Sequence, residues 1–187
     1  MHFSVTEIVH DLVRPHLKPG DTAFDGTAGN GHDTLFLARC VGSTGHVCAW
    51  DIQPLAIERA AALLATHGIT WVELTLGNHA ELDTFSGRYF HAAIFNLGYL
   101  PASDRTIVTT TASSIRAVRA VVERLASGGI LTVLAYTAHV GGDDEANAVC
   151  QLLQSLDPSE FAFHEERFAP GRTAPPRLFV LRKSRIT

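Results

Sequence analysis

Cysteine is scarce in this chain of 187 residues, which has only three, and no two of them are spaced as C-x-x-C. An odd number without paired spacing does not fit a framework of disulfides. Two of the three lie inside apolar patterns, so we expect reduced, buried thiols, as in a cytoplasmic protein. The three cysteines are Cys40, Cys48 and Cys150.

Charge and long apolar runs are also sparse. Charged residues make up 18% of the chain, and the net charge of −4 gives no overall attraction to nucleic acid. The sequence has no apolar run of membrane-helix length and no secretion-signal pattern, so we expect a cytoplasmic protein without a membrane contact. The segment from Arg167 to the end contains no acidic residue. This segment could contact a polyanion or form an ordinary solvated face. Its cations are Arg167, Arg172, Arg177, Arg182, Lys183 and Arg185.

Short apolar runs alternate with helical patterns along the chain, which predicts a mostly parallel sheet with helices on both faces. The expected strands are residues 22–24, 46–50, 70–76, 92–95, 130–135, 161–168 and 177–181. The expected helices lie within residues 1–18, from 34 onward, and at 55–65, 106–126 and 143–156. No helix separates the last two strands, so we expect them to pair antiparallel at one edge of the sheet. The length fits a single α/β domain.

A glycine-rich turn occupies residues 24–34, between the first strand and the helix that follows it. Such a turn lets a nucleotide-like ligand approach the backbone closely. Counted from Gly29 and Gly31, the third glycine of a G-x-G-x-x-G fingerprint is replaced by Thr34. Asp33 also places a negative charge at the helix start, where a diphosphate is disfavoured. The turn therefore favours a nucleoside with a cationic end, such as S-adenosylmethionine, over NAD.

Asp51 ends the second strand twenty residues after Gly31, which is where a ribose diol is bound in nucleotide-binding sheets. Other polar clusters also follow predicted strands. Because ligands bind at the carboxyl ends of the strands, we expect all of these clusters to meet at one edge. They are residues 25–33, 51–53, 78–79, 96–101 and 136–142.

Several of these strings resemble one family. They are D-G-T-A-G-N-G-H-D-T at 25–34, D-I-Q at 51–53, F-N-L-G-Y-L-P at 95–101, H-x-G-G at 139–142 and P-P at 175–176. They are similar to class I S-adenosylmethionine-dependent methyltransferases of the YtqB/MnmM type, the "putative rRNA methylase" family. One departure is Gly26, where the family pattern leads us to expect Ala, and Gly fits any turn that Ala does.

The resemblance implies a Rossmann-like class I methyltransferase fold, α/β, with a seven-stranded sheet and an antiparallel terminal hairpin. It covers a single domain over residues 1–187, whose N-terminal helix (1–18) would lie over the ligand edge. It also implies methylation of the aminomethyl group of wobble 5-aminomethyl(-2-thio)uridine in tRNA. The donor would be S-adenosylmethionine, the product S-adenosylhomocysteine, and the protein a homodimer. We expect the tRNA anticodon region to contact the basic surface near Arg172 and Arg177.

Two other functions stay open beside this one. Methylation of rRNA or of a small-molecule amine would use the same donor site. A non-catalytic nucleoside-binding or NAD-binding module is a third possibility, which the polar loop at Asn96 and the missing third glycine disfavour.

The resemblance also implies which residues hold the methionine end of the donor. Asn30, His32 and Asp33 would contact it, and Asp33 or Asp25 would face the ammonium group. Asp25 could instead only cap the turn, and His32 could be an ordinary polar residue at a helix start. The remaining residues expected to bind the donor at this turn are Gly29, Gly31 and Thr34.

The rest of the donor would be held by the next strands. Asp51 and Gln53 would bind the ribose, and Asn78 and His79 would lie beside the adenine, although His79 could also be an exposed loop residue. Asn96 would contact the donor close to its methyl group.

The expected catalytic residues are Asn96, Tyr99, Tyr136 and His139. Asn96 matches the first residue of the N-P-P-Y motif of amino-methyltransferases, and its carbonyl oxygen would accept a hydrogen bond from the substrate amine. Tyr136 and His139 could instead simply close the fifth strand. The loop and strand-end histidines lack metal-ligand spacing, so we expect no metal. These are His32, His79, His139 and His164.

Overall fold

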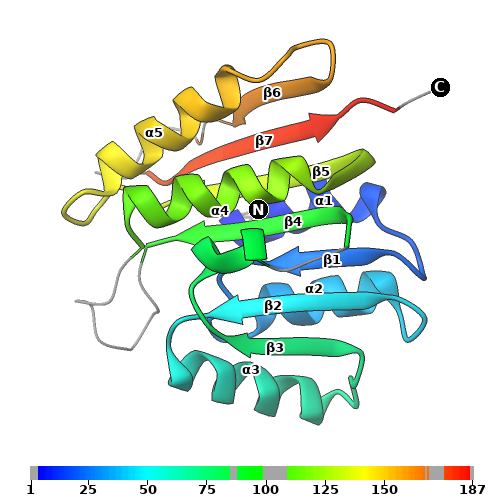
Figure 1. Cartoon of the computed structure of the whole chain (residues 1–187). Coiled ribbons are helices and arrows are strands. Elements are labelled where there is room, and N and C mark those ends of the chain that lie inside the picture. The colour runs from blue at the N-terminus through cyan, green and yellow to red at the C-terminus, as the bar shows by residue number, and fades with distance from the viewer. Residues whose placement is uncertain (1–3, 85–87, 99–108, 167, 169–174, 186–187) are drawn as a thin grey trace.

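The computed structural model of the chain describes residues 4–84, 88–98, 109–166, 168 and 175–185 (Figure 1). These residues form a seven-stranded sheet in the order β3-β2-β1-β4-β5-β7-β6. The strands are β1 (Thr22–Asp25), β2 (His46–Asp51), β3 (Val72–Leu76), β4 (Phe90–Leu97), β5 (Leu125–Ala135), β6 (Phe161–Glu166) and β7 (Arg177–Lys183). Strands β1 to β5 pair in parallel, whereas β7 is antiparallel to both β5 and β6. The predicted fold class and its terminal hairpin are confirmed.

Helices cover both faces of the sheet, as Figure 1 shows. They are α1 (Val5–Val13), α2 (His32–Val41), α3 (Pro54–Thr66), α4 (Thr111–Glu123) and α5 (Gly142–Gln154), with short 3₁₀ turns η1 (Arg14–His16) and η2 (His79–Thr84). Helices α1, α2 and α3 share one core with Ile94 and Leu134, whereas α4 and α5 share the other with Phe95 and Leu131. Each described helix is too short or too polar to cross a bilayer.

Helix α1 begins where the sequence predicts, because Ser4 and Glu7 cap each other's backbone N–H groups at 3.2 and 2.7 Å. The helix lies on the face of the sheet against α2 and β5. His10 is near the ligand edge, and His16, just beyond the helix, bonds the carbonyl of Gly128 near the opposite edge. The expectation that the helix lies over the ligand edge stays a prediction.

Several predicted boundaries differ from the structure. The helix predicted for 106–126 ends at Glu123, because Leu125 is fully buried and pairs with Phe90 as the first residue of β5. Gly129 lies inside this strand rather than ending a helix, and a Cβ there would be 2.9 Å from a backbone oxygen. The start predicted at 106 lies outside the described residues. The sixth strand ends at Glu166 and not at 168.

Candidate functional site

Because β1, β2, β4 and β5 run parallel, their carboxyl ends meet at one edge of the sheet (Figure 1). Asp25 and Asp51 are the last residues of β1 and β2, and Tyr136 directly follows β5. Asn96 lies within β4, one residue before its end, and pairs with Leu134. The structure therefore places these predicted residues along one edge, most of them anchored in strands rather than in loops.

Asp51 joins the glycine turn to the second strand. Its Oδ2 accepts a hydrogen bond from the backbone N–H of Gly29, and its Oδ1 accepts one from Gln53, both at 2.9 Å. Gly31 has φ +85°, and a Cβ there would lie 2.8 Å from the Cα of Ala60 in α3, so the close approach of turn and helix requires glycine. Each oxygen of Asp51 keeps acceptor capacity for a further donor.

Asp25 is fully buried beneath this turn. It accepts hydrogen bonds from the Thr34 hydroxyl at 2.6 Å and from the Thr27 N–H at 3.1 Å. Burial, followed by the nearby charge of Asp33, raises the pKa of Asp25 from 3.8 to about 7. Asp25 thus stabilises the turn through its hydrogen bonds to Thr27 and Thr34. A contact of Asp25 or Thr34 with a ligand stays a prediction.

Asp33 is the centre of a network that connects α1 to β4. Its Oδ1 lies 2.6 Å from His10 Nε2, and its Oδ2 accepts a hydrogen bond from the side-chain amide of Asn96. The His10 ring is held in turn by stacking on Phe36, with ring centroids 3.9 Å apart and planes within 6°. The sequence does not reveal His10, because it is 23 residues upstream on an ordinary amphipathic helix.

This network sets the orientation of the Asn96 amide. An ionised carboxylate only accepts hydrogen bonds, so the amide nitrogen of Asn96 must face Asp33. The backbone N–H of Asn96 donates to the Thr27 hydroxyl at 2.7 Å, which fixes the position of the residue. Within the described part of the chain, the Oδ1 of Asn96 has no hydrogen-bond partner and is left as the available acceptor.

His79 is buried, with 4% of its surface exposed, so the alternative of an exposed loop histidine is wrong. Its Nδ1 donates to the carbonyl of Gly26 at 2.9 Å, and its ring meets the edge of Phe95. Burial lowers the pKa of His79, so the ring is neutral. His79 therefore supports the glycine turn. Its neighbour Asn78 accepts a hydrogen bond from the N–H of Ala80 at 2.9 Å.

The other predicted donor-site residues differ in exposure. His32 is exposed at the start of α2, whereas Gln53 is 8% exposed at the start of α3. Asn30 Oδ1 accepts a hydrogen bond from Arg59 at 3.1 Å, which connects the turn to α3. Next to this group, large apolar side chains are exposed at the ends of β2 and β3: Ile52 by 47% and Leu76 by 57%.

The loop after β5 lies beside the end of β4. A Cβ at Gly98 would be 3.4 Å from the Cβ of Tyr136, whose ring side chain is 40% exposed. His139 lies against its own loop, with Nδ1 3.2 Å from the carbonyl of Val140 and Nε2 close to Gly142. The fourth residue predicted to be catalytic, Tyr99, lies outside the described residues.

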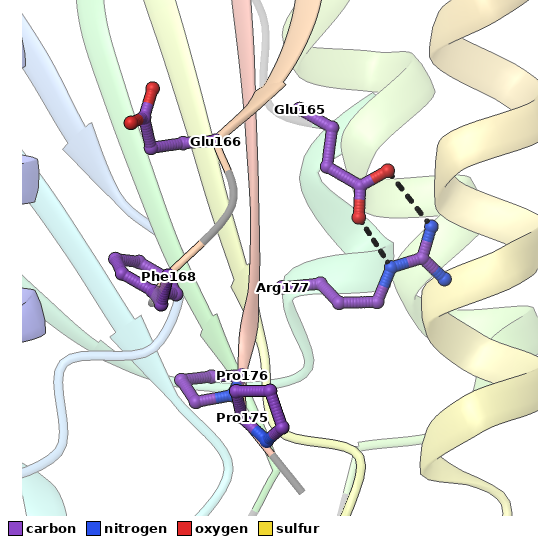
Figure 2. Close-up of a pocket in the computed structure, with 6 residues that line it drawn as sticks. All are labelled: Glu165, Glu166, Phe168, Pro175, Pro176 and Arg177. Atoms are coloured by element: carbon purple, nitrogen blue, oxygen red, sulfur yellow. Dashed lines mark hydrogen bonds and ion pairs between the residues drawn. The ribbon is translucent and has the colours of Figure 1, made fainter. Parts of the chain in front are cut away.

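Arg177, expected to contact RNA phosphates, has partners within the protein. Figure 2 shows its guanidinium paired with both oxygens of Glu165, at 2.7 and 3.2 Å. It also donates to Asn147 at 2.7 Å and lies 4.9 Å from the centre of the Phe179 ring. The adjoining pocket of about 390 Å³ contains two carboxylates, which disfavour a phosphate there. Its lining residues are Glu165, Glu166, Phe168, Pro175, Pro176 and Arg177.

The cations of β7, within the described residues, lie at opposite ends of the strand. Because β7 is antiparallel to β5, Arg177 pairs with Ala135 at the ligand edge, whereas Arg182 pairs with Ile130 near the other end of the strand. Lys183, one residue further, lies at that opposite edge as well. Arg167 and Arg172 are outside the described residues.

Comparison with known proteins points to one family. The chain matches the family model described as "Putative rRNA methylase" over residues 47–182. It is 30% identical to "tRNA (mnm(5)s(2)U34)-methyltransferase, chloroplastic" of Arabidopsis thaliana, over 95% of this chain and 69% of that protein. A solved structure from Clostridium thermocellum, named as a "putative rRNA-methylase", has a TM-score of 0.93 at 34% identity, covering 98% of this chain and 99% of the other. A "putative methyltransferase" of Streptococcus mutans, solved in complex with SAH, has a TM-score of 0.88 at 32% identity, covering 98% and 99%.

Proposed function

As the chain belongs to the "Putative rRNA methylase" family and is an S-adenosylmethionine-dependent methyltransferase, we propose that it modifies the wobble uridine of tRNA. The reaction is N-methylation of the aminomethyl group of 5-aminomethyl(-2-thio)uridine, which gives the 5-methylaminomethyl form. The name of the Arabidopsis thaliana relative supports tRNA, whereas the family description supports rRNA. The cytoplasmic location and the homodimer stay predictions.

The described residues fit the donor. Bound S-adenosylmethionine supplies a methyl group on a cationic sulfur. Asp51, pre-oriented by two backbone N–H groups, has the acceptor capacity for the ribose hydroxyls. Ile52 follows Asp51 in the chain and Leu76 pairs with Asp51 across β2 and β3, and their exposed apolar side chains suit the faces of an adenine ring. The turn residues Asn30 and His32 remain our candidates for the methionine end, and Asp33 for its ammonium group.

The observation that carries the proposal is the fixed orientation of the Asn96 side-chain amide. Asp33 holds the amide nitrogen, so Oδ1 is the atom that an incoming amine can use. Accepting one N–H of the amine directs the nitrogen lone pair toward the donor methyl. The nitrogen–carbon bond then forms as the sulfur–carbon bond breaks, and the extra proton on nitrogen is released to solvent.

An alkylamine must lose a proton before it can react. With a pKa like that of Lys, about 10.4, deprotonation at pH 7 costs on the order of 4 kcal/mol. Desolvation at the site lowers this cost, because it disfavours the ammonium form. Positioning the amine and methyl group in line supplies a further contribution of up to roughly 7–11 kcal/mol.

The acceptor nucleotide is proposed to enter beside the loop after β5. Tyr136 is 40% exposed there, and Val140 is fully exposed, so both side chains present surface to a base turned out of the anticodon loop. Stacking on an aromatic ring is a common way to hold an unpaired base. For phosphate contacts Arg172 remains a candidate, whereas Arg177 would first have to leave Glu165.

The deciding experiment is nucleoside mass spectrometry of tRNA and rRNA from a deletion strain. The proposal expects 5-aminomethyl(-2-thio)uridine to accumulate in tRNA, the methylaminomethyl form to disappear, and rRNA methylation to stay unchanged. Purified protein should then restore the methyl group on tRNA from that strain. Loss of an rRNA methyl mark with intact tRNA would replace this function by rRNA methylation, and no change in either RNA would favour a small-molecule amine.

A further inference from the structure

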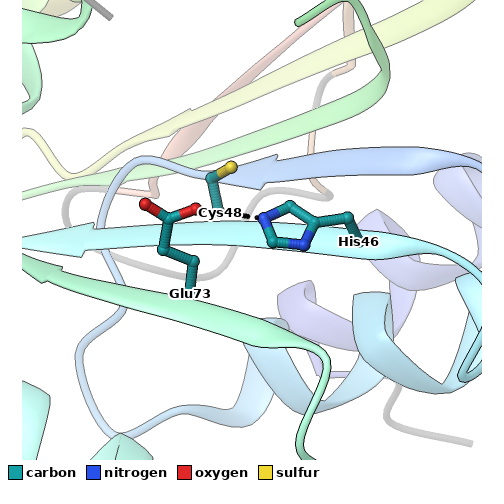
Figure 3. Close-up of side chains that lie close together, drawn as sticks. All are labelled: His46, Cys48 and Glu73. Atoms are coloured by element: carbon teal, nitrogen blue, oxygen red, sulfur yellow. Dashed lines mark hydrogen bonds and ion pairs between the residues drawn. The ribbon is translucent and has the colours of Figure 1, made fainter.

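A second group of reactive side chains lies away from the donor edge. His46 and Cys48 are two positions apart on β2, so their side chains face the same side of the sheet. Glu73 on β3 pairs directly with Cys48 (Figure 3). His46 is the first residue of β2 and Asp51 the last, which separates the two sites by about 17 Å at roughly 3.3 Å per residue. The methyltransferase proposal uses none of the three residues.

The three side chains already converge. His46 Nε2 and Glu73 Oε2 are 3.2 Å apart, and the three potential ligand atoms all lie within 4.8 Å of one another. A tetrahedral zinc ion, with bonds of about 2.0–2.1 Å to N and O and about 2.3 Å to S, separates its N and O ligands by about 3.3 Å and S from either by about 3.5 Å. The nitrogen and oxygen thus have the required spacing, and the sulfur lies within 4.8 Å of both.

The cluster also contains a cation. The Nη1 of Arg88 lies 3.8 Å from Glu73 Oε2 and 3.9 Å from Cys48 Sγ. These are an ion pair and a hydrogen bond to sulfur, each near the upper distance limit for its kind, and the side chains of Arg88 and Glu73 are each 43% exposed. Such a contact contributes little to stability, so the guanidinium can be replaced by an ion that binds the same two groups more closely.

We propose that His46, Cys48 and Glu73 bind one zinc ion, with a water molecule as the fourth ligand. Imidazole, thiolate and carboxylate together are ligands that zinc accepts in tetrahedral sites. As the sulfur–zinc bond forms, the thiol proton leaves to solvent. The ion ties β3, the edge strand of the sheet, to β2. This proposal revises the expectation of no metal, which considered only the spacing of loop and strand-end histidines.

The test is a titration of metal-free full-length protein with Co²⁺, a spectroscopic substitute for zinc, followed by displacement with Zn²⁺. The expected result is one ion per chain, with the visible bands of four-coordinate Co²⁺ and a near-ultraviolet thiolate-to-cobalt band. Cys48→Ser should abolish the thiolate band, and Glu73→Gln should weaken binding at least about tenfold. Arg88→Ala should tighten binding, because it removes the competing cation.

Cys150→Ser is the matched control, since this cysteine is also buried but lies on α5, outside the cluster. It should keep the stoichiometry, the spectrum and the affinity of the wild type. If Cys48→Ser does not fold, His46→Gln and Glu73→Gln decide, since both side chains are partly exposed. Absence of the thiolate band in the wild type, or equal affinity in wild type and Glu73→Gln, would overturn the proposal. Methyl transfer to tRNA is a separate readout that these outcomes do not touch.

Discussion

Replacing Asn96 by Ala removes the carbonyl oxygen that we assign to the substrate amine. Its hydrogen bond strengthens as the nitrogen attacks, so the loss should lower kcat more than it raises KM. Removing one preorganised hydrogen-bonding group at a transition state costs about 2.7–4 kcal/mol, or roughly 10²–10³ in rate. The assay is single-turnover methyl transfer to tRNA that contains 5-aminomethyluridine, with donor affinity measured by calorimetry in parallel.

Asp33→Asn tests whether Asp33 fixes the orientation of the Asn96 amide, because an amide at position 33 can either donate or accept a hydrogen bond. Asn96 can then turn its nitrogen toward the substrate. The bond that is weakened involves a charged group and is worth about 1.5–3 kcal/mol, so kcat should fall by roughly 10–100-fold. His10→Ala, which leaves Asp33 with one fewer partner, should have a smaller effect in the same direction.

Asn96→Asp tests the same contact with Asp33. A second carboxylate against Asp33 would force the pair to share a proton, so this variant should be poor at every pH at which the protein folds. Gln154→Ala, which removes an exposed amide at the end of α5, is the matched control and should be as active as the wild type. A rate for Asn96→Ala within threefold of the wild type, with donor bound, would refute the catalytic assignment.

Three further predictions concern the glycine turn. Asp51→Ala should weaken donor binding at least tenfold in calorimetric titration, since two ribose hydroxyls lose a charged acceptor worth about 2–4 kcal/mol in total; unchanged affinity would remove the ribose assignment. Gly26→Ala should destabilise the fold by about 1–3 kcal/mol in urea unfolding, because its Cβ would lie 2.1 Å from the buried ring of Phe95. Adding Phe95→Leu to this variant should recover part of the loss. If the destabilisations of the two single variants simply add in the double variant, the steric explanation is contradicted. Asp25 has a folded-state pKa raised from 3.8 to about 7, so its contribution to stability is complete below pH 4 and is lost as the pH rises to 7, by about 4 kcal/mol in total. Asp25→Asn should remove the roughly 2.7 kcal/mol of this loss that occurs between pH 5 and pH 8, and an unchanged difference in unfolding free energy would show that other groups cause it.

Predictions from local signals agree well with the structure. The capping box of Ser4 and Glu7 starts the first helix, and the glycine turn lies between β1 and α2 as expected. The terminal hairpin follows from two strand patterns without a helix between them. Each of these features depends on residues close in sequence, whose backbone preferences and hydrogen bonds are set within a few positions.

Packing adds information that local signals do not contain. At Gly26, where the family pattern leads us to expect Ala, the ring of Phe95 occupies the space that an Ala methyl group needs. Among the cations after Glu166, the direction of β7 separates Arg177 from Arg182. Neither fact can be read from composition or spacing.

By itself the sequence determined the α/β class, the glycine turn and the carboxyl edge at which the polar clusters meet, because alternating strands and helices must form such a sheet. The tertiary structure alone decided which atoms those clusters present. It placed His10 of α1 and Asn96 of β4 against Asp33, which fixes the orientation of the Asn96 amide. It also placed Glu73 beside Cys48 through the pairing of β2 with β3. Such contacts join residues more than twenty positions apart, and their geometry is set by strand register and helix packing, which leave no periodic signal in the chain.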